Sequence, residues 1–414
     1  MKLLKFVGLF VMITFVVLVG CSKKGEGDGG ANKQSPTENK QTPQQSSLKQ
    51  RMEASYKKAA DWLVSKQGSD GTWKAGNFPS VGYTAMVSYA LSGASPDVRK
   101  SYETAISKAI GYVISKQGED GSFSDEGFNK TYITSIVVMS LASADKDKYA
   151  DAIKRAQTFL VGGQQKSGIY KGGAGYGDIE AEMKDGKFVT KKRERADMSN
   201  TSFAMEALKA SGLPEDSPYW KDAVEFLAKC QNSSETNTDP ELMDVLAKAG
   251  IKIGNDGGFV YSPDYNQAGE ETYADASKYM RSYGSMTYAG IKSFLYANVD
   301  KNDERVKAAV EWAKNHYTLD VNAGMPADKA KQGLFYYYTT FSKAMGALGV
   351  EEFEDAKGEK HKWAEELVEK LISLQTAEGG SAWKNESPRW SEGDPVLATS
   401  YAIMTYNTIR KWIK

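Results

Sequence analysis

Residues 62–73, WLVSKQGSDGTW, and residues 112–123, YVISKQGEDGSF, are two copies of one pattern. In each copy an aromatic residue is followed by four residues, a glutamine and an Asp-Gly-x-aromatic turn. Further copies are weaker, and the fifth unit has Tyr317 where the glutamine should stand. The other five units carry Gln67, Gln117, Gln164, Gln231 and Gln375. Units that repeat at roughly 45 to 65 residues indicate stacked supersecondary elements and not separate domains.

The segments on either side of this pattern have helical spacing. The first helix of each unit is apolar on one face, as Tyr56, Ala60 and Leu63 illustrate, so it has one buried side and one wet side. The second helix begins near a threonine and is apolar or small on nearly every side, which indicates that neighbours enclose it. These second helices cover residues 84–91, 134–141, 201–208, 287–294 and 399–406.

Alternating half-buried and enclosed helices form either an open solenoid with polar end units or a ring with the enclosed helices inside. The sixth unit is as apolar as the first, so we predict the ring: an all-α (α/α)6 toroid of six helical-hairpin repeats with a funnel on its axis. The third unit carries an insertion, Glu180–Arg195, whose Asp185-Gly186 centre predicts a small β-hairpin with a type I′ turn. Its basic run at 191–195 is either a contact for an acidic ligand or a solvated strand.

The N-terminus predicts export and a lipid anchor. Lys2 and Lys5 precede an apolar run, residues 6–19, that ends in Leu-Val-Gly-Cys at Cys21. This resembles the bacterial lipoprotein signal, in which the cysteine is diacylated and becomes the first mature residue. Two acyl chains suffice for stable anchoring, whereas one binds reversibly. Position 22 is a serine and not the aspartate that retains some lipoproteins at the inner membrane. This favours the outer membrane.

These features divide the chain into three parts. Residues 1–21 are predicted to be the lipoprotein signal peptide ending at the acylated cysteine, and residues 49–414 one toroid domain. Residues 22–48 have almost no residues that can form a core and are predicted to be a disordered tether. We therefore expect a lipid-anchored protein of the bacterial cell envelope.

Composition excludes some partners. The chain has 53 Lys plus Arg and 53 Asp plus Glu, so no net field attracts nucleic acid or an anionic surface. The second cysteine, Cys230, has no partner once Cys21 is acylated, and its apolar neighbourhood predicts buried packing.

The repeated Gln-x2-Asp-Gly-x-Trp/Phe pattern resembles that of the terpenoid cyclase and protein prenyltransferase superfamily, squalene-hopene cyclase in particular, over about residues 50–414. The resemblance implies an (α/α)6 toroid whose central cavity holds a polyprenyl chain in catalytic members. In the cyclases an inner helix begins Asp-x-Asp-Asp-Thr-Ala, and its middle aspartate protonates an alkene. The matching segment here is DMSNTS, residues 197–202.

In this segment Asp197 stands at the family's first aspartate, Ser199 at the proton donor and Asn200 at the last aspartate. A serine hydroxyl cannot protonate an alkene, so the resemblance implies loss of squalene cyclisation. The three residues form either a polar cluster at the cavity mouth or a helix N-cap.

Family prenyltransferases bind zinc with Asp, Cys and His. The soft ligands available here are Cys230, His316 and His361, and none is spaced like a zinc site. We therefore expect no metal, no cofactor and no zinc prenyltransferase activity.

Other candidate cavity residues lie in three places. Arg281 and Tyr283 follow the acidic pair Glu270-Glu271 in a long fourth unit, which is either a charged cover over the funnel or a solvated loop. Asp394 precedes the last inner helix and is either a second mouth carboxylate or a helix start. From the aromatic patch at 336–341 we place Tyr337 and Tyr338 on the cavity wall.

The sequence thus favours a lipid-anchored toroid that binds a hydrophobic, isoprenoid-like or polymeric ligand, including a glycan, in its central cavity. One alternative is an enzyme of unassigned chemistry that acts on an isoprenoid or polysaccharide through Asp197, Asp394 or the 270–281 loop. The other is a scaffold whose outer ring binds protein partners.

Overall fold

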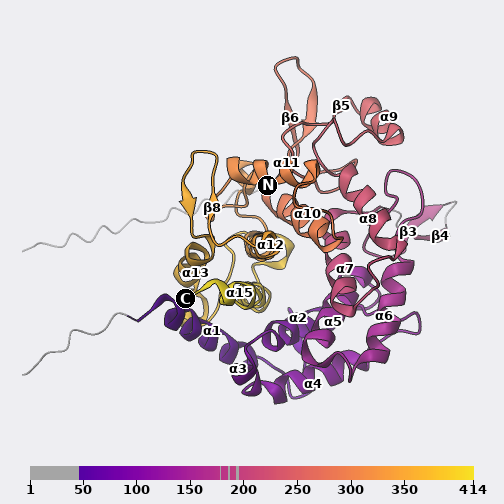
Figure 1. Ribbon diagram of the computed structural model, residues 1–414. Helices are drawn as coiled ribbons and strands as arrows, with labels where there is room; N and C mark the ends of the chain where they lie inside the picture. The colour runs from indigo at the N-terminus through magenta and orange to yellow at the C-terminus, as the bar shows by residue number, and fades with distance from the viewer. Residues whose placement is uncertain (1–45, 178, 185–186, 193–194) are drawn as a thin grey trace, which may run out of the picture. The chain divides into compact units, whose positions relative to one another are not determined.

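The computed structural model of the protein describes residues 46–177, 179–184, 187–192 and 195–414. Over this part, two concentric rings of helices form the predicted toroid (Figure 1). The inner ring consists of α2 (Val81–Ser92), α5 (Lys130–Asp145), α7 (Met198–Ser211), α10 (Gly284–Tyr296), α12 (Leu334–Leu348) and α15 (Pro395–Ile409). The outer ring consists of α1 (Leu48–Ser65), α4 (Glu103–Ile114), α6 (Ala150–Gly162), α8 (Pro218–Lys229), α11 (Glu304–Asn315) and α13 (Trp363–Leu374).

Both rings are closed. Each inner helix packs on the next one along the chain, and the last, α15, packs on the first, α2. In the outer ring α1 packs on α13 in the same way. The inner helices are buried on almost every side, as their composition predicted, while the outer helices bury one face.

The repeated glutamines hold the outer ring together. Gln67 Nε2 donates to the carbonyl of its own turn at Gly71 (3.0 Å) and to Ala105 at the start of the next outer helix (2.9 Å). Gln117, Gln164 and Gln231 make the same pair of bonds. In the last unit Gln375 Nε2 donates to the carbonyl of Ser55 in α1 (3.1 Å), so the bond that links neighbouring repeats also closes the ring.

A second repeated bond explains the threonine near the start of the inner helices. The hydroxyl of Thr84 accepts from the backbone N–H of Trp73 in the preceding turn (3.0 Å), and Thr134 does the same for Phe123 (2.8 Å). The equivalent hydroxyls of later units are those of Thr201, Thr287 and Thr399. Each bond fixes a turn over the end of its inner helix.

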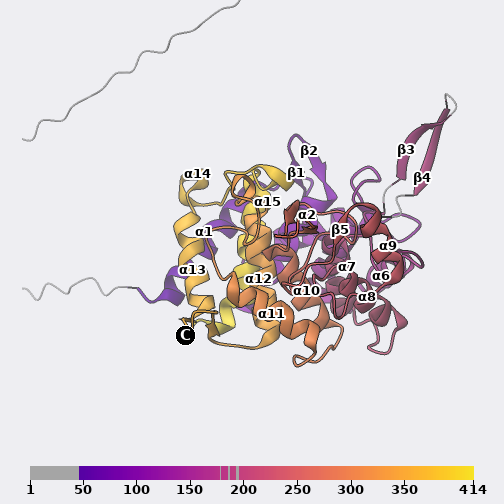
Figure 2. The same ribbon diagram turned by 90° about the horizontal axis from the view of Figure 1, so that it is seen from above.

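Short strands and helices lie in the connections between the ring helices. The predicted hairpin is confirmed as β3 (Ile179–Lys184) paired antiparallel with β4 (Lys187–Lys192), and Figure 2 shows it projecting away from the rings; the predicted turn residues, Asp185 and Gly186, lie outside the described residues. The other elements are β1 (Trp73–Ala75) with β2 (Phe78–Ser80), β5 (Ile251–Lys252) with β7 (Lys278–Met280) and β6 (Glu270–Thr272), β8 (Phe353–Glu354) with β9 (Lys360–His361), and the helices α3 (Pro96–Lys100), α9 (Pro240–Lys248) and α14 (Ala377–Gly380). Within residues 46–414, none of the described helices has the length and apolarity needed to span a bilayer.

Candidate functional site

A cavity of about 410 Å³ opens among the N-terminal ends of the inner helices. Its wall is dominated by aromatic rings and thioethers, and the only charged side chain among the described lining residues is that of Asp125. Seven tyrosines contribute to the wall: Tyr83, Tyr132, Tyr176, Tyr261, Tyr283, Tyr336 and Tyr401. The apolar part is completed by Met86, Ile133, Met286, Leu397 and Trp390. This volume falls in the range of small-molecule sites.

The tyrosine hydroxyls bond to one another across the wall. Tyr132 and Tyr401 hydroxyls are 2.5 Å apart, and those of Tyr176 and Tyr261 are 3.0 Å apart. Ser199 Oγ donates to the hydroxyl of Tyr336 (3.3 Å). The wall is therefore amphipathic, with ring faces for apolar contact and hydroxyls for polar contact.

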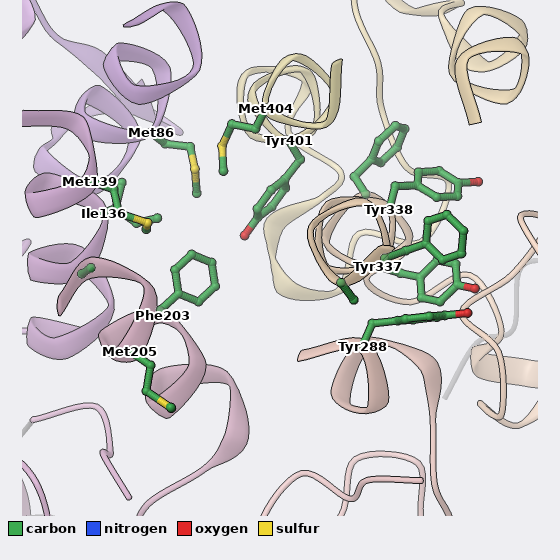
Figure 3. Close-up of a cluster of buried hydrophobic side chains, with 14 of the residues drawn as sticks. Met86, Ile136, Met139, Phe203, Met205, Tyr288, Tyr337, Tyr338, Tyr401 and Met404 are labelled. Carbon is green, nitrogen blue, oxygen red and sulfur yellow. The ribbon is translucent and has the colours of Figure 1, made fainter. Parts of the chain in front are cut away.

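Aromatic packing continues beyond two of the lining tyrosines. The ring of Phe203 lies 4.5 Å from that of Tyr132 and 5.9 Å from that of Tyr336, centroid to centroid. Figure 3 shows Phe203, Tyr401 and Met86 pointing from different inner helices into the space between them. Phe203 stands four positions after the lining residue Ser199, which is about one helical turn further along α7.

Further along the inner helices from the cavity lies a buried ionic cluster. Glu206 accepts from Lys292 Nζ (2.8 Å) and from Lys343 Nζ, and all three side chains are buried. Burial alone would raise the pKa of Glu206, but the two ammonium groups outweigh it and lower that pKa to about 2. The residues follow the lining residues Ser199, Ser285 and Tyr336 by seven positions each, which is two helical turns or about 10 Å deeper.

The segment that matches the cyclase acid is split by the structure. Ser199 lines the cavity, whereas Asp197 and Asn200 do not appear on its wall. Asp197 is the N-cap of α7 and accepts from the backbone N–H and side-chain Nδ2 of Asn200, both at 2.9 Å. Burial raises the pKa of Asp197 to about 6, against the hydrogen bonds from Asn200. Of the two interpretations of Asp197, helix N-cap and polar residue at the cavity mouth, its contacts are those of an N-cap.

Two of the predicted wall residues are misplaced. Tyr337 and Tyr338 lie on the far side of α12 from the cavity, where their hydroxyls donate to the carbonyls of Thr318 and Leu319, both at 2.7 Å (Figure 3). Their neighbour Tyr336 lines the cavity instead. The sequence could not fix this choice, because α12 is apolar on all sides and one residue turns the helix by about 100°.

The other candidates lie around the mouth. Tyr283 lines the cavity, but Arg281 does not and pairs with Glu271. Asp394 is an N-cap that accepts from the backbone N–H of Val396 (2.8 Å). The sequence did not identify Asp125, which lines the mouth and accepts from the hydroxyl of Ser80 and the backbone N–H of Val81, both at 2.6 Å.

Backbone strain also gathers at the mouth. Trp390 and Ser391 both line the cavity with left-handed backbone conformations, φ 54° and 63°. Such conformations cost a non-glycine residue of order 1–2 kcal/mol and concentrate at functional positions. Trp390 is 39% exposed, so a ring face is available at the entrance.

Comparison with known proteins agrees with this architecture. Residues 77–244 match the family model of the squalene-hopene cyclase C-terminal domain. No curated protein matches the chain significantly in sequence. The type II terpene cyclase MstE from Scytonema, in its apo form, superposes with a TM-score of 0.52 at 12% identity, covering 87% of this chain and 98% of that chain. A variant of it in complex with geranylgeranyl dihydroxybenzoate also gives 0.52, at 10% identity and 88% and 99% coverage.

The repeats and the closed double ring thus define a toroid similar to those of the terpenoid cyclase and protein prenyltransferase superfamily. Within that superfamily the sequence similarity is to squalene-hopene cyclase, over residues 77–244.

Proposed function

We propose that the protein binds a neutral, hydrophobic, isoprenoid-like ligand in the central cavity without cyclising it. The observation that carries the proposal is the cavity itself, whose wall of seven tyrosines, methionines and aliphatic side chains fits an apolar chain with a polar end. A strongly anionic head group is disfavoured. The one charged side chain among the described lining residues is that of Asp125, and its negative charge would repel an anion. The fold's likeness to MstE, whose complex holds a geranylgeranyl compound, supports the same class of ligand.

Loss of cyclase chemistry is part of the proposal. Alkene protonation needs a carboxylic acid that faces the substrate. At the matching position of the cavity wall this protein has the hydroxyl of Ser199 instead. Asp197 is turned away into the cap of α7. We therefore propose a binding protein, with an enzyme of other chemistry as the alternative to be tested.

A glycan is the second candidate ligand. Trp390 presents a partly exposed ring at the mouth, and tyrosine hydroxyls line the wall behind it. Sugar rings stack on such faces and bond to such hydroxyls.

The ligand test starts from the full-length protein extracted from the envelope membrane in detergent. Co-purifying small molecules are identified by mass spectrometry for the wild type, for Ser199→Trp, which fills the cavity, and for Ser65→Trp, which adds the same ring to an exposed position on α1. An isoprenoid lipid that is present in the wild type and Ser65→Trp but lost in Ser199→Trp supports the proposal. Equal recovery from all three proteins contradicts it, and a co-purifying oligosaccharide favours the glycan.

Catalysis is tested separately with Asp197→Asn. Incubation of the identified ligand with wild type and variant, followed by mass spectrometry, asks whether the ligand is converted. Unchanged ligand in both samples is expected for a binding protein. A product formed by the wild type and not by Asp197→Asn would instead establish an enzyme.

We also propose that the protein is anchored to the bacterial envelope through a diacylated Cys21, with the outer membrane as its site. The residues around Cys21 carry this part of the proposal. Mass spectrometry of the N-terminal peptide should show a chain that starts at an acylated Cys21, and Cys21→Ser should release the protein from membranes. A mature chain that retains residues 1–21 contradicts it.

A further inference from the structure

We propose that Asp355, Glu359 and His361 form a binding site for one divalent transition-metal ion, with Zn²⁺ as the expected occupant. The three residues lie in and beside the turn of the β8–β9 hairpin, between α12 and α13 (Figure 1), and none of them lines the central cavity. Each offers one ligand atom, and these atoms all lie within 4.8 Å of one another. The site is independent of the ligand proposed for the cavity.

The hairpin turn places the two carboxylates. Asp355 N–H donates to the carbonyl of Glu359 (2.9 Å), and Gly358, at φ +82°, allows the chain to reverse between them. Asp355 Oδ1 accepts from the backbone N–H groups of Lys357 (2.8 Å) and Glu359 (2.9 Å). With Oδ1 engaged by the turn, Oδ2 faces His361 Nε2 at 3.6 Å.

A second, independent observation concerns the orientation of the histidine. His361 Nδ1 lies 3.2 Å from Glu366 Oε1, and Glu366 Oε2 accepts from the hydroxyl of Tyr317 (2.8 Å). Because a carboxylate only accepts, this contact places an imidazole proton on Nδ1, and in the neutral ring Nε2 then presents its lone pair toward Asp355. That Nε2 is buried and makes no hydrogen bond.

A buried imidazole nitrogen that faces a carboxylate at 3.6 Å without a hydrogen bond is unfavourable, and a metal ion placed between the two groups would bind both. Histidines that bind metals commonly donate their other N–H to a carboxylate, which is the arrangement of His361 and Glu366. The ring of His361 also stacks on that of Tyr317, with 3.9 Å between the ring centroids. The imidazole is therefore held in place before any ion binds.

The spacing suits a small tetrahedral ion. Zinc bonds of about 2.0–2.1 Å to nitrogen and oxygen put two ligand atoms roughly 3.4 Å apart at a tetrahedral angle, close to the 3.6 Å between His361 Nε2 and Asp355 Oδ2. Glu359 is exposed and free to swing its carboxylate toward the ion. One imidazole nitrogen with two carboxylates favours Zn²⁺ over Ca²⁺ or Mg²⁺, which prefer shells of six or more oxygens.

The position of the site suggests its role. The fifth repeat has Tyr317 in place of the glutamine that links outer helices elsewhere, and Tyr317 reaches α13 by bonding to Glu366. A metal on His361 would connect the β8–β9 hairpin to the same chain of contacts. We assign the ion a structural role in joining the fifth and sixth repeats.

The experiment uses the full-length protein in detergent, stripped with EDTA and titrated with Zn²⁺. The sequence has two histidines, so their imidazole ¹⁵N signals can be assigned by comparing His361→Gln with His316→Gln. His316 is the matched control, because its Nδ1 lies 2.8 Å from the Trp312 carbonyl and its ring stacks on Trp312, 4.1 Å between centroids. We expect one equivalent of Zn²⁺ and a shift of the His361 Nε2 signal.

The variants complete the test. His361→Gln and Asp355→Asn should lose the stoichiometric site, and His316→Gln should keep it. Glu366→Gln, which removes the carboxylate behind the histidine, should weaken Zn²⁺ binding by about 10- to 100-fold. The proposal is overturned if the wild-type His361 signal does not respond to Zn²⁺, or if that signal shows a protonated imidazole held between Asp355 and Glu366 in the presence of Zn²⁺. The NMR readout on the wild type does not depend on whether any variant folds.

Discussion

The buried Glu206 should be among the most sensitive positions in the protein. It holds Lys292 and Lys343 on the axis of the toroid, and Glu206→Gln would leave two buried ammonium groups without a counter-charge. Removing one partner of a buried ion pair typically costs about 3–5 kcal/mol. Against the effect of burial, the two ammonium groups lower the Glu206 pKa in the folded protein, which is the direction expected for ion pairs that stabilise the fold.

The pH dependence has a definite sign. Because the pKa of Glu206 is lower in the folded protein than in the unfolded chain, its stabilising effect is present above about pH 4.5 and is lost as the pH falls toward 2. Urea unfolding followed by circular dichroism should therefore show a loss of about 3–5 kcal/mol for Glu206→Gln at pH 7. The difference between wild type and variant should shrink on acidification.

Two controls separate the charge from the packing. Asp244→Asn breaks an exposed pair with Lys248 and should leave the urea midpoint unchanged. Replacing Glu206, Lys292 and Lys343 together by methionine removes every charge of this cluster, and such swaps are often neutral or stabilising. If Glu206→Gln costs less than about 1 kcal/mol at pH 7, or if the triple variant is as unstable as the single one, then the ionic cluster does not behave as argued.

Two further substitutions probe the repeats and the cap of α7. Gln117→Ala removes two bonds of 3.0 Å, to the carbonyls of Gly121 and Ala152, and should lower the free energy of unfolding by about 2 kcal/mol in a urea titration; an unchanged midpoint would show that the repeated glutamine is not a brace. Asp197→Asn should stabilise the protein by about 1–3 kcal/mol at pH 8 and leave it unchanged at pH 4. Because the pKa of Asp197 is raised to about 6 in the folded protein, the ionised carboxylate is less favourable there than in the unfolded chain, and asparagine cannot ionise. A variant that is less stable than the wild type at pH 8 would contradict this.

The sequence predicted the toroid because its signals are repeated and local. The spacing of glutamine, turn aromatic and threonine recurs in five of the six repeats, and the structure shows a defined bond for these residues in the first repeat. The β3–β4 hairpin followed from its alternating strands and turn centre. Such features depend on neighbouring residues, so a single chain displays them.

The site was harder to predict because it depends on helix rotation and on contacts across the ring. Ser199 and Tyr283, which the sequence proposed as ligand-binding residues, lie on the cavity wall, but the sequence could not choose Tyr336 over Tyr337 and Tyr338. The sequence analysis considered His361 as a metal ligand and expected no metal, because Asp355 and Glu359 meet His361 only when the β8–β9 turn forms. A usable signal was present for Glu206, since a lone charge in an otherwise apolar enclosed helix must find a partner.

The depth of the ionic cluster bears on how a ligand is bound. Beyond the lining residues the inner helices carry Phe203 and then Glu206 with its lysines, so a polymer that ran on along these helices would have to separate the ion pairs, at a cost of about 3–5 kcal/mol. A ligand that occupies only the cavity contacts aromatic faces and hydroxyls and leaves the ion pairs intact. This asymmetry favours a molecule inserted by one end, such as the tail of a lipid, over a chain that runs through the toroid. For the same reason a glycan would be held by its terminal rings near Trp390 and not along its length.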